Sequence, residues 1–140
     1  MNVRLWNRVA VAMGAFVGFA GIMHFGSPGF FNDLVPPWLP PSRSFWTYAS
    51  GVVELIVALL LLSPRRRRTG AVCAVLLFVG VYPGNLYMAW DWRNEPIGDQ
   101  LVAYGRLPFQ FLFIWLAWKI AQANDDVDMP QVPGDVDLRG

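Results

Sequence analysis

Residues 45–62 read FWTYASGVVELIVALLLL, an apolar stretch of eighteen residues with a single charged side chain, Glu54. As an α-helix this stretch would measure about 27 Å at ~1.5 Å per residue, close to the ~30 Å hydrocarbon thickness of a bilayer. A carboxylate in such a segment costs roughly 2.5–3.5 kcal/mol, so it should face protein or water and have partners. The stretch therefore predicts a transmembrane helix with a polar site around Glu54.

The rest of the chain fits the same class. Three further apolar segments accompany the first, at about residues 9–25, 70–90 and 100–121. Of the 140 residues, 55% are apolar and 15% are charged, a balance that favours an integral membrane protein. We expect an all-α, four-helix transmembrane bundle over residues 1–123. Residues 124–140, rich in aspartate, glycine and proline, predict an acidic and flexible C-terminal tail.

The basic residues predict the orientation. Residues 65–68 are four consecutive arginines between the second and third apolar segments, and positive residues stay on the cytoplasmic side of a membrane. With this loop inside, both termini are cytoplasmic and the protein is multi-pass, N-in/C-in. The other basic residues agree: Arg4, Arg8, Lys119 and Arg139 fall inside, and Arg43, Arg93 and Arg106 fall outside.

The loop between the first two helices, residues 27–44, reads SPGFFNDLVPPWLPPSRS. Its five prolines exclude a long helix, because each lacks an N–H donor and restricts the residue before it. Its aromatic and aliphatic residues need an apolar surface. An anchor at the level of the lipid headgroups and a lid or rim over a cavity both fit this composition.

Polar residues recur at similar heights on the four predicted helices. Counted at ~1.5 Å per residue, one or two on each helix fall in the outer half of the bilayer. They are His24, Glu54, Asn85, Arg106 and Gln110. We expect them to form a cluster with Tyr82 in the outer mouth of the bundle, with Glu54 and Arg106 as its charged pair.

This cluster has a structural and a functional interpretation. As a structural network it would hold the helices in register. As the base of a pocket lined by Trp38, Trp46 and Trp90, it would suit a lipid-like or quinone-like molecule, because such ligands need apolar walls and a few convergent polar groups. His24 and Glu54 could then exchange protons with a quinone.

The composition also excludes several kinds of chemistry. A single cysteine, Cys73, rules out an internal disulfide and dithiol exchange within this chain. A single histidine rules out a bis-histidine haem in one copy. A net charge of +1 without a basic, aromatic stripe argues against a nucleic-acid partner. No spacing of histidine, cysteine or carboxylates indicates a metal site.

Five short motifs, in their order along residues 10–121, resemble the DoxX family of small four-helix membrane proteins. They are GIMHF at 21–25, VPPWLP at 35–40, GVVE at 51–54, PGN at 83–85 and RLPFQ at 106–110. The resemblance implies a four-helix bundle in a prokaryotic inner membrane. It also implies an association with membrane redox chemistry, since relatives include a subunit of a thiosulfate–quinone oxidoreductase.

Three functions follow as hypotheses. The first is an accessory subunit of a membrane redox complex that binds a quinone or lipid near Glu54 and His24. The second is a structural or assembly partner of other membrane proteins. The third is a small membrane enzyme acting on a hydrophobic substrate, for which neither the residues nor the resemblance assigns a catalytic group.

Overall fold

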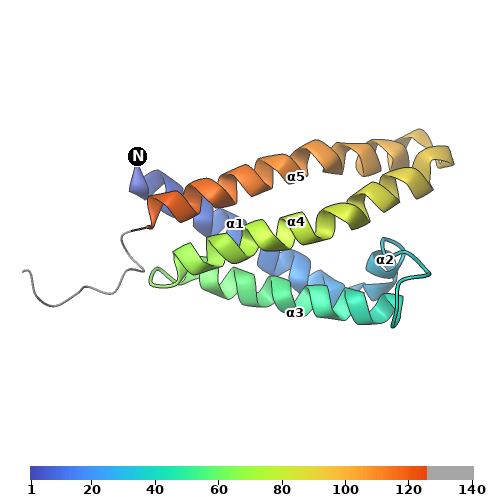
Figure 1. Ribbon diagram of the computed structural model, residues 1–140, viewed down its shortest axis with the longest axis horizontal. Helices are drawn as coiled ribbons and strands as arrows, with labels where there is room; N and C mark the ends of the chain where they lie inside the picture. Colours follow the sequence, from blue (N-terminus) through green and yellow to red (C-terminus); the bar gives the residue numbers. More distant parts are fainter. Residues whose placement is uncertain (126–140) are drawn as a thin grey trace, which may run out of the picture.

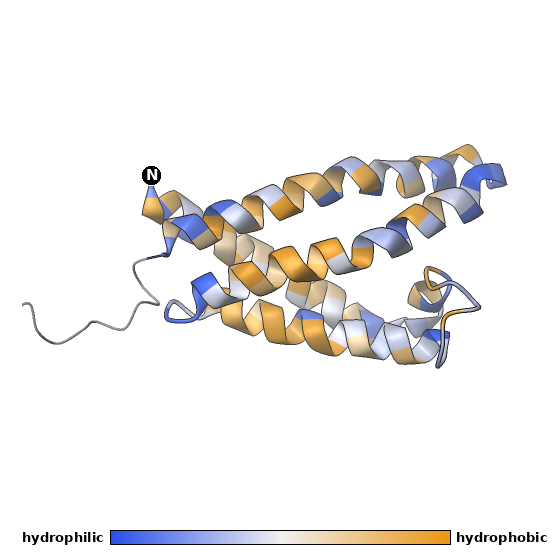
Figure 2. Ribbon diagram, in the orientation of Figure 1, coloured by the Kyte–Doolittle hydropathy of each residue, from blue (hydrophilic) through white to orange (hydrophobic). Residues whose placement is uncertain are grey.

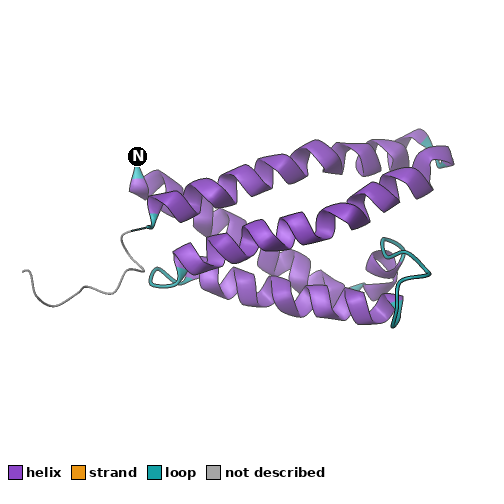
Figure 3. Cartoon of the chain, in the orientation of Figure 1, coloured by secondary structure: helices purple, strands orange, loops and turns teal. Residues whose placement is uncertain are grey.

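The computed structural model describes residues 1–125, which form helices joined by loops and turns, with no strand among them (Figure 3). The elements are α1 (Val3–Gly26), α2 (Pro28–Asn32), α3 (Arg43–Leu62), α4 (Arg67–Asp91), the 3₁₀ helix η1 (Trp92–Asn94) and α5 (Ile97–Ala123). α1, α3, α4 and α5 are each long and apolar enough to cross a membrane. The all-α prediction with four membrane-length helices is therefore confirmed. Of the tail predicted over residues 124–140, Asn124 and Asp125 form a turn after α5, and the rest lies outside the described residues.

Local capping extends the helices beyond their apolar stretches. The Asn2 side chain accepts a hydrogen bond of 3.2 Å from the backbone N–H of Leu5, and Ser42 does the same for Phe45. Each side chain satisfies a backbone donor that the first turn of a helix leaves unpaired. α1 therefore begins before the apolar segment predicted from about residue 9, and α3 begins before residue 45.

The four long helices associate as two close pairs, α1 with α3 and α4 with α5, and α3 also contacts α4 (Figure 1). Glycines bring α1 and α3 together. A Cβ atom added at Gly21 would lie 3.1 Å from the carbonyl oxygen of Gly51, and one added at Gly51 would lie 2.8 Å from His24 Cβ. Such close backbone approach is typical of small-residue interfaces between membrane helices.

The packed core occupies the half of the molecule near the arginine loop. There the four long helices contribute small and branched residues that are buried together: Ala10, Met13, Val17, Val57, Ala58, Leu61, Ala71, Ala74, Phe78, Ala117, Ile120 and Ala121. In the other half, a small cluster of Met88, Ala89 and Ala103 joins α4 to α5, and Leu34 of the loop after α2 packs against it. α4 diverges from α3 toward this end, where α2 lies (Figure 1).

The outer surfaces of the helices are strongly apolar. Large side chains such as Phe19, Leu59 and Leu76 are 64%, 70% and 67% exposed. Apolar residues occupy much of the helix length between hydrophilic ends (Figure 2). Apolar surface of this extent on every long helix is consistent with a multi-pass membrane protein.

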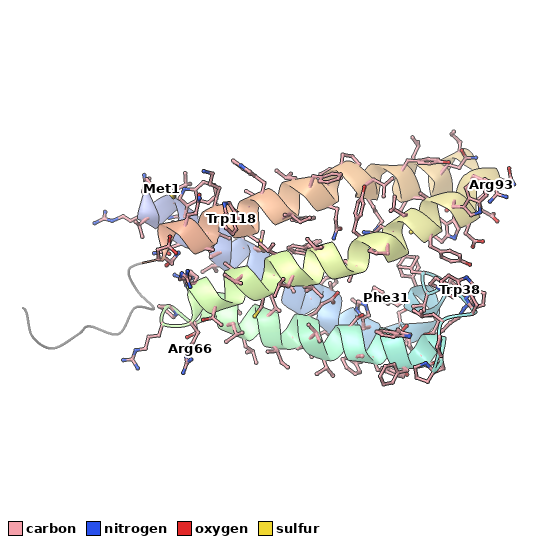
Figure 4. The ribbon with its side chains drawn as sticks, in the orientation of Figure 1. Met1, Phe31, Trp38, Arg66, Arg93 and Trp118 are labelled. Carbon is pink, nitrogen blue, oxygen red and sulfur yellow. The ribbon has the colours of Figure 1, made fainter. Side chains whose placement is uncertain are left out.

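One arginine of the basic loop is part of the fold. Arg67 is 6% exposed, and its Nε donates a hydrogen bond of 3.0 Å to the carbonyl oxygen of Leu61. Its Nη2 lies 3.5 Å from the carbonyl oxygen of Leu62. These carbonyls belong to the last turn of α3, which has no helical donors left for them. Arg67 therefore caps α3, whereas the neighbouring Arg66 is exposed at the end of the molecule (Figure 4).

Candidate functional site

A cavity of about 760 Å³ lies between the α1/α3 pair and the α4/α5 pair, in the half without the packed core. Its volume falls within the ~300–1,000 Å³ typical of ligand pockets. All four long helices and the loop after α2 contribute to its wall. Phe16 on α1 and Phe109 on α5 line the cavity yet are 52% and 59% exposed, so the cavity opens to the apolar surface of the protein.

Missing side chains on α4 keep the cavity open. Gly80 and Gly84 both line it, one helical turn apart. A Cβ atom at Gly80 would meet nothing within 4 Å, and one at Gly84 would meet only the carbonyl oxygen of Leu34, at 3.9 Å. Between them stands Pro83, which cannot donate the helical hydrogen bond to residue 79. At these two positions α4 therefore presents backbone rather than side chains to the cavity.

His24 and Glu54 meet on the α1/α3 wall. His24 Nδ1 lies 3.2 Å from Glu54 Oε2 and 2.8 Å from the carbonyl oxygen of Ala20. The two side chains are 9% and 14% exposed. Glu54 Oε2 itself is buried and has no hydrogen-bond donor among the described residues. The carboxylate thus has an electrostatic neighbour but an incomplete set of hydrogen bonds.

A second polar group joins α4 to α5 on the opposite wall. The Asn85 amide Nδ2 donates a hydrogen bond of 3.0 Å to Gln110 Oε1, and Gln110 Nε2 donates in turn to the carbonyl oxygen of Phe78. The Phe78 carbonyl lies one residue before the carbonyl of Val79, which Pro83 leaves without its helical donor. Gln110, 6% exposed, therefore supports the interrupted part of α4 from α5.

Arg106 extends from α5 and lines the same cavity. The predicted Glu54–Arg106 ion pair is wrong, because the ion-pair partner of Glu54 among the described residues is His24. Arg106 Nη1 instead lies 3.5 Å from the sulfur of Met88. Arg106 and Glu54 both line the cavity, but they form no ion pair with each other. Similar predicted height did not imply that the side chains meet, because α3 and α5 belong to different helix pairs, with the cavity between them.

The loop after α1 covers the end of the cavity away from the packed core. Phe31, from α2, stacks on His24 with ring centroids 3.7 Å apart. Thr47 Oγ1 donates a 2.7 Å hydrogen bond to Asn32 Oδ1, and Trp46 Nε1 donates a 3.0 Å hydrogen bond to the carbonyl oxygen of Pro40. These bonds fix the loop on α3. The loop residues Phe31, Leu34, Val35, Pro36, Trp38 and Leu39 line the cavity, and Phe31 and Trp38 lie at the loop end of the molecule in Figure 4.

Seven of the nine predicted site residues line the cavity and two do not. His24, Glu54, Asn85, Arg106, Gln110, Trp38 and Trp46 line the cavity. Tyr82 and Trp90 do not: the Tyr82 ring packs on Phe111 at 5.3 Å, and Trp90 is 68% exposed beneath the guanidinium of Arg93. Sequence reasoning missed Phe31 and Thr47, whose roles depend on how the proline-rich loop folds back. Among residues 1–125, no three or more histidine, cysteine or carboxylate side chains are placed to hold a metal ion.

Comparison with known proteins corrects the family expected from the motifs. No curated protein and no solved structure matches this chain. A family model does match, over residues 13–121, and its description is Domain of unknown function (DUF8561). The resemblance to DoxX is therefore wrong: the five motifs are short, and they consist of the glycines, prolines and sparse polar residues that membrane helices commonly share. The matched region covers most of the four long helices, and the chain belongs to the DUF8561 family.

Proposed function

We propose that this protein binds a hydrophobic small molecule with a polar head group in the cavity between the α1/α3 and α4/α5 pairs. The observation that carries the proposal is the cavity itself, about 760 Å³ with mainly apolar walls and polar side chains from all four long helices. This combination is typical of sites for lipid-like ligands. Its opening beside Phe16 and Phe109 suits a ligand that arrives from the bilayer.

Incomplete hydrogen bonding supports ligand binding over a purely structural role. Buried polar groups that only hold helices together are normally satisfied by one another. Asn85 and Gln110 follow this rule. Glu54 Oε2 does not, since no group among residues 1–125 donates a hydrogen bond to it, and the acceptor at Arg106 Nη1 is a sulfur atom, which accepts weakly. Both of these residues line the cavity.

The same proposal includes an orientation in the inner (plasma) membrane. Arg66 and Arg93 lie at opposite ends of the molecule (Figure 4). The end with Arg66 also carries the other arginines of the loop, so the positive-inside rule puts both chain termini in the cytoplasm and the cavity in the outer half of the bilayer. In a Cys73→Ala background, an impermeant maleimide applied to intact cells should label Arg93→Cys and spare Arg66→Cys. The reverse pattern would invert the proposed orientation.

Ligand retention tests the binding proposal. The protein would be purified in mild detergent, and molecules extracted from it would be identified by mass spectrometry. Gly80→Leu should place a side chain in the cavity without a clash, because a Cβ there meets nothing within 4 Å. Gly105→Leu is the matched control, since its Cβ is equally unobstructed but Gly105 does not line the cavity.

We expect an amphiphilic molecule in extracts of the wild type and of Gly105→Leu, and about tenfold less with Gly80→Leu, equivalent to ~1.4 kcal/mol of binding free energy. A quinone in that fraction would connect the protein to membrane redox chemistry, and a lipid would not. Equal recovery from Gly80→Leu and Gly105→Leu would overturn the proposal.

A further inference from the structure

We infer that the head group of the ligand is an anion, a carboxylate or a phosphate, and that Arg106 binds it. This inference rests on the proposed function, because it concerns the same cavity. It goes further because it assigns a negative charge to the head group of the ligand and says where the head group and the apolar end bind.

Arg106 lacks the anionic partner that its position requires. A guanidinium has five N–H donors and is always charged. Among residues 1–125, the ion pairs are His24–Glu54, Arg43–Asp33 and Arg68–Asp125, and none includes Arg106. Arg106 is half-buried, with Met88 Sδ at 3.5 Å. A partly desolvated charge with no carboxylate within ion-pair distance is costly, and an anionic ligand would reduce that cost through charge-assisted hydrogen bonds.

The other polar groups of the cavity do not replace that anion. Glu54 lies on the opposite wall, 3.2 Å from His24. Gln110 already uses its Oε1 with Asn85 and its Nε2 with the Phe78 carbonyl. The cavity therefore has a cation on the α5 wall without a contacting acceptor stronger than sulfur. Charge complementarity then selects a negatively charged head group at this wall.

The apolar end of the ligand has its own place. Phe109 and Phe113 follow Arg106 by three and seven residues on α5, so they extend the same helix face. Phe113 stacks with Phe16 at 5.2 Å and with Phe78 at 5.5 Å. The rings of Phe16, Phe78 and Phe113 line the cavity on the side of the packed core. A single alkyl chain would extend from Arg106 along Phe109 to these rings.

Three probes that share a sixteen-carbon chain test the head group. They are palmitate, hexadecyl phosphate and hexadecanol, each offered in radiolabelled form to the purified protein in detergent at pH 8, with equilibrium binding as the measurement. We expect at least one anionic probe to bind about tenfold more tightly than hexadecanol, equivalent to ~1.4 kcal/mol. Tighter binding of palmitate would indicate a free fatty acid, and tighter binding of hexadecyl phosphate would indicate a lipid with a phosphate head group.

Variants locate the effect. Arg106→Gln should bring the anionic probes to the affinity of hexadecanol, and Arg106→Lys should keep part of the preference because the charge remains. Arg93→Gln is the control, since Arg93 is exposed on Trp90 and does not line the cavity. If hexadecanol bound the wild type as tightly as both anions, in a manner blocked by Gly80→Leu, the inference would fail and the proposed function would stand. If Gly80→Leu affected no probe, both would fail.

Discussion

His24 Nδ1 is placed between two oxygen atoms, at 2.8 Å from the Ala20 carbonyl and 3.2 Å from Glu54 Oε2. Because a carbonyl oxygen can only accept, Nδ1 carries a hydrogen atom and donates it within α1. Phe31 covers one face of the ring, with 25° between the two planes. The orientation of the imidazole is thus set by α1 and α2, and Glu54 meets it from α3.

The His24–Glu54 contact predicts energetic coupling between α1 and α3. We expect His24→Gln and Glu54→Gln to be non-additive in a double-mutant cycle, with a coupling of about 0.6–1.7 kcal/mol, the range of interhelical polar contacts in lipid. Unfolding of the protein in mixed detergent micelles measures the free energies. The matched cycle pairs Glu54→Gln with Arg106→Gln, which do not touch, and its coupling should be smaller. Additive effects of the first pair would contradict the assigned contact.

Gln110 should contribute more to stability than its size suggests. Gln110→Met keeps the volume but leaves the Asn85 amide and the Phe78 carbonyl without their partner. Each unsatisfied buried group costs about 1–3 kcal/mol, so we expect a loss in that range. Gln122→Met is the control, because Gln122 is exposed and accepts a hydrogen bond only from Lys119 among the described contacts. A Gln110→Met protein as stable as Gln122→Met would show that α4 needs no support at Pro83.

Helix height explains how much of the site the sequence could predict. The rise per residue gives the depth of Glu54, Asn85 and Gln110 directly, and all three line the cavity. Which side chain meets which depends on rotation and divergence of the helices, which a single sequence does not contain. Glu54 was therefore assigned to Arg106 instead of His24. Tyr82, which the sequence also predicts in this cluster, packs its ring on Phe111 instead.

For the fold, too, local features of the sequence could be predicted and long-range contacts could not. Hydrophobic length alone predicted the four long helices, because a bilayer fixes how many apolar residues a span needs. The short helix α2, from Pro28 to Asn32, was not predicted, because the five prolines of this segment indicated a loop. Proline is acceptable in the first turn of a helix, and Pro28 occupies that turn. The packing of Phe31 on His24 then depends on long-range contacts that no local pattern records.

Arg67 should differ from its neighbours in the basic run. Arg67→Gln removes the hydrogen bonds to the Leu61 and Leu62 carbonyls at the end of α3. Because charge-assisted hydrogen bonds are worth about 1.5–3 kcal/mol, we expect a loss of that order in the free energy of unfolding. Arg66→Gln removes the same charge from an exposed position and should change stability by less than about 0.5 kcal/mol. Equal effects of the two variants would mean that the run acts only through its net charge.

Gly70 should be the glycine that least tolerates a methyl group. A Cβ atom there would lie 2.6 Å from the Leu61 backbone nitrogen and 2.7 Å from the Leu60 carbonyl carbon. Both are backbone atoms of α3 and cannot rotate away, so Gly70→Ala must push α3 and α4 apart at their packed end. Overpacking of this kind costs about 1–3 kcal/mol, whereas Gly105→Ala, with no atom within 4 Å of its Cβ, should gain roughly 0.5–1 kcal/mol from helix propensity. Thermal unfolding of the two purified variants in detergent compares them directly, and a Gly70→Ala protein that melts at or above the wild-type temperature would show that α3 and α4 are not in this contact.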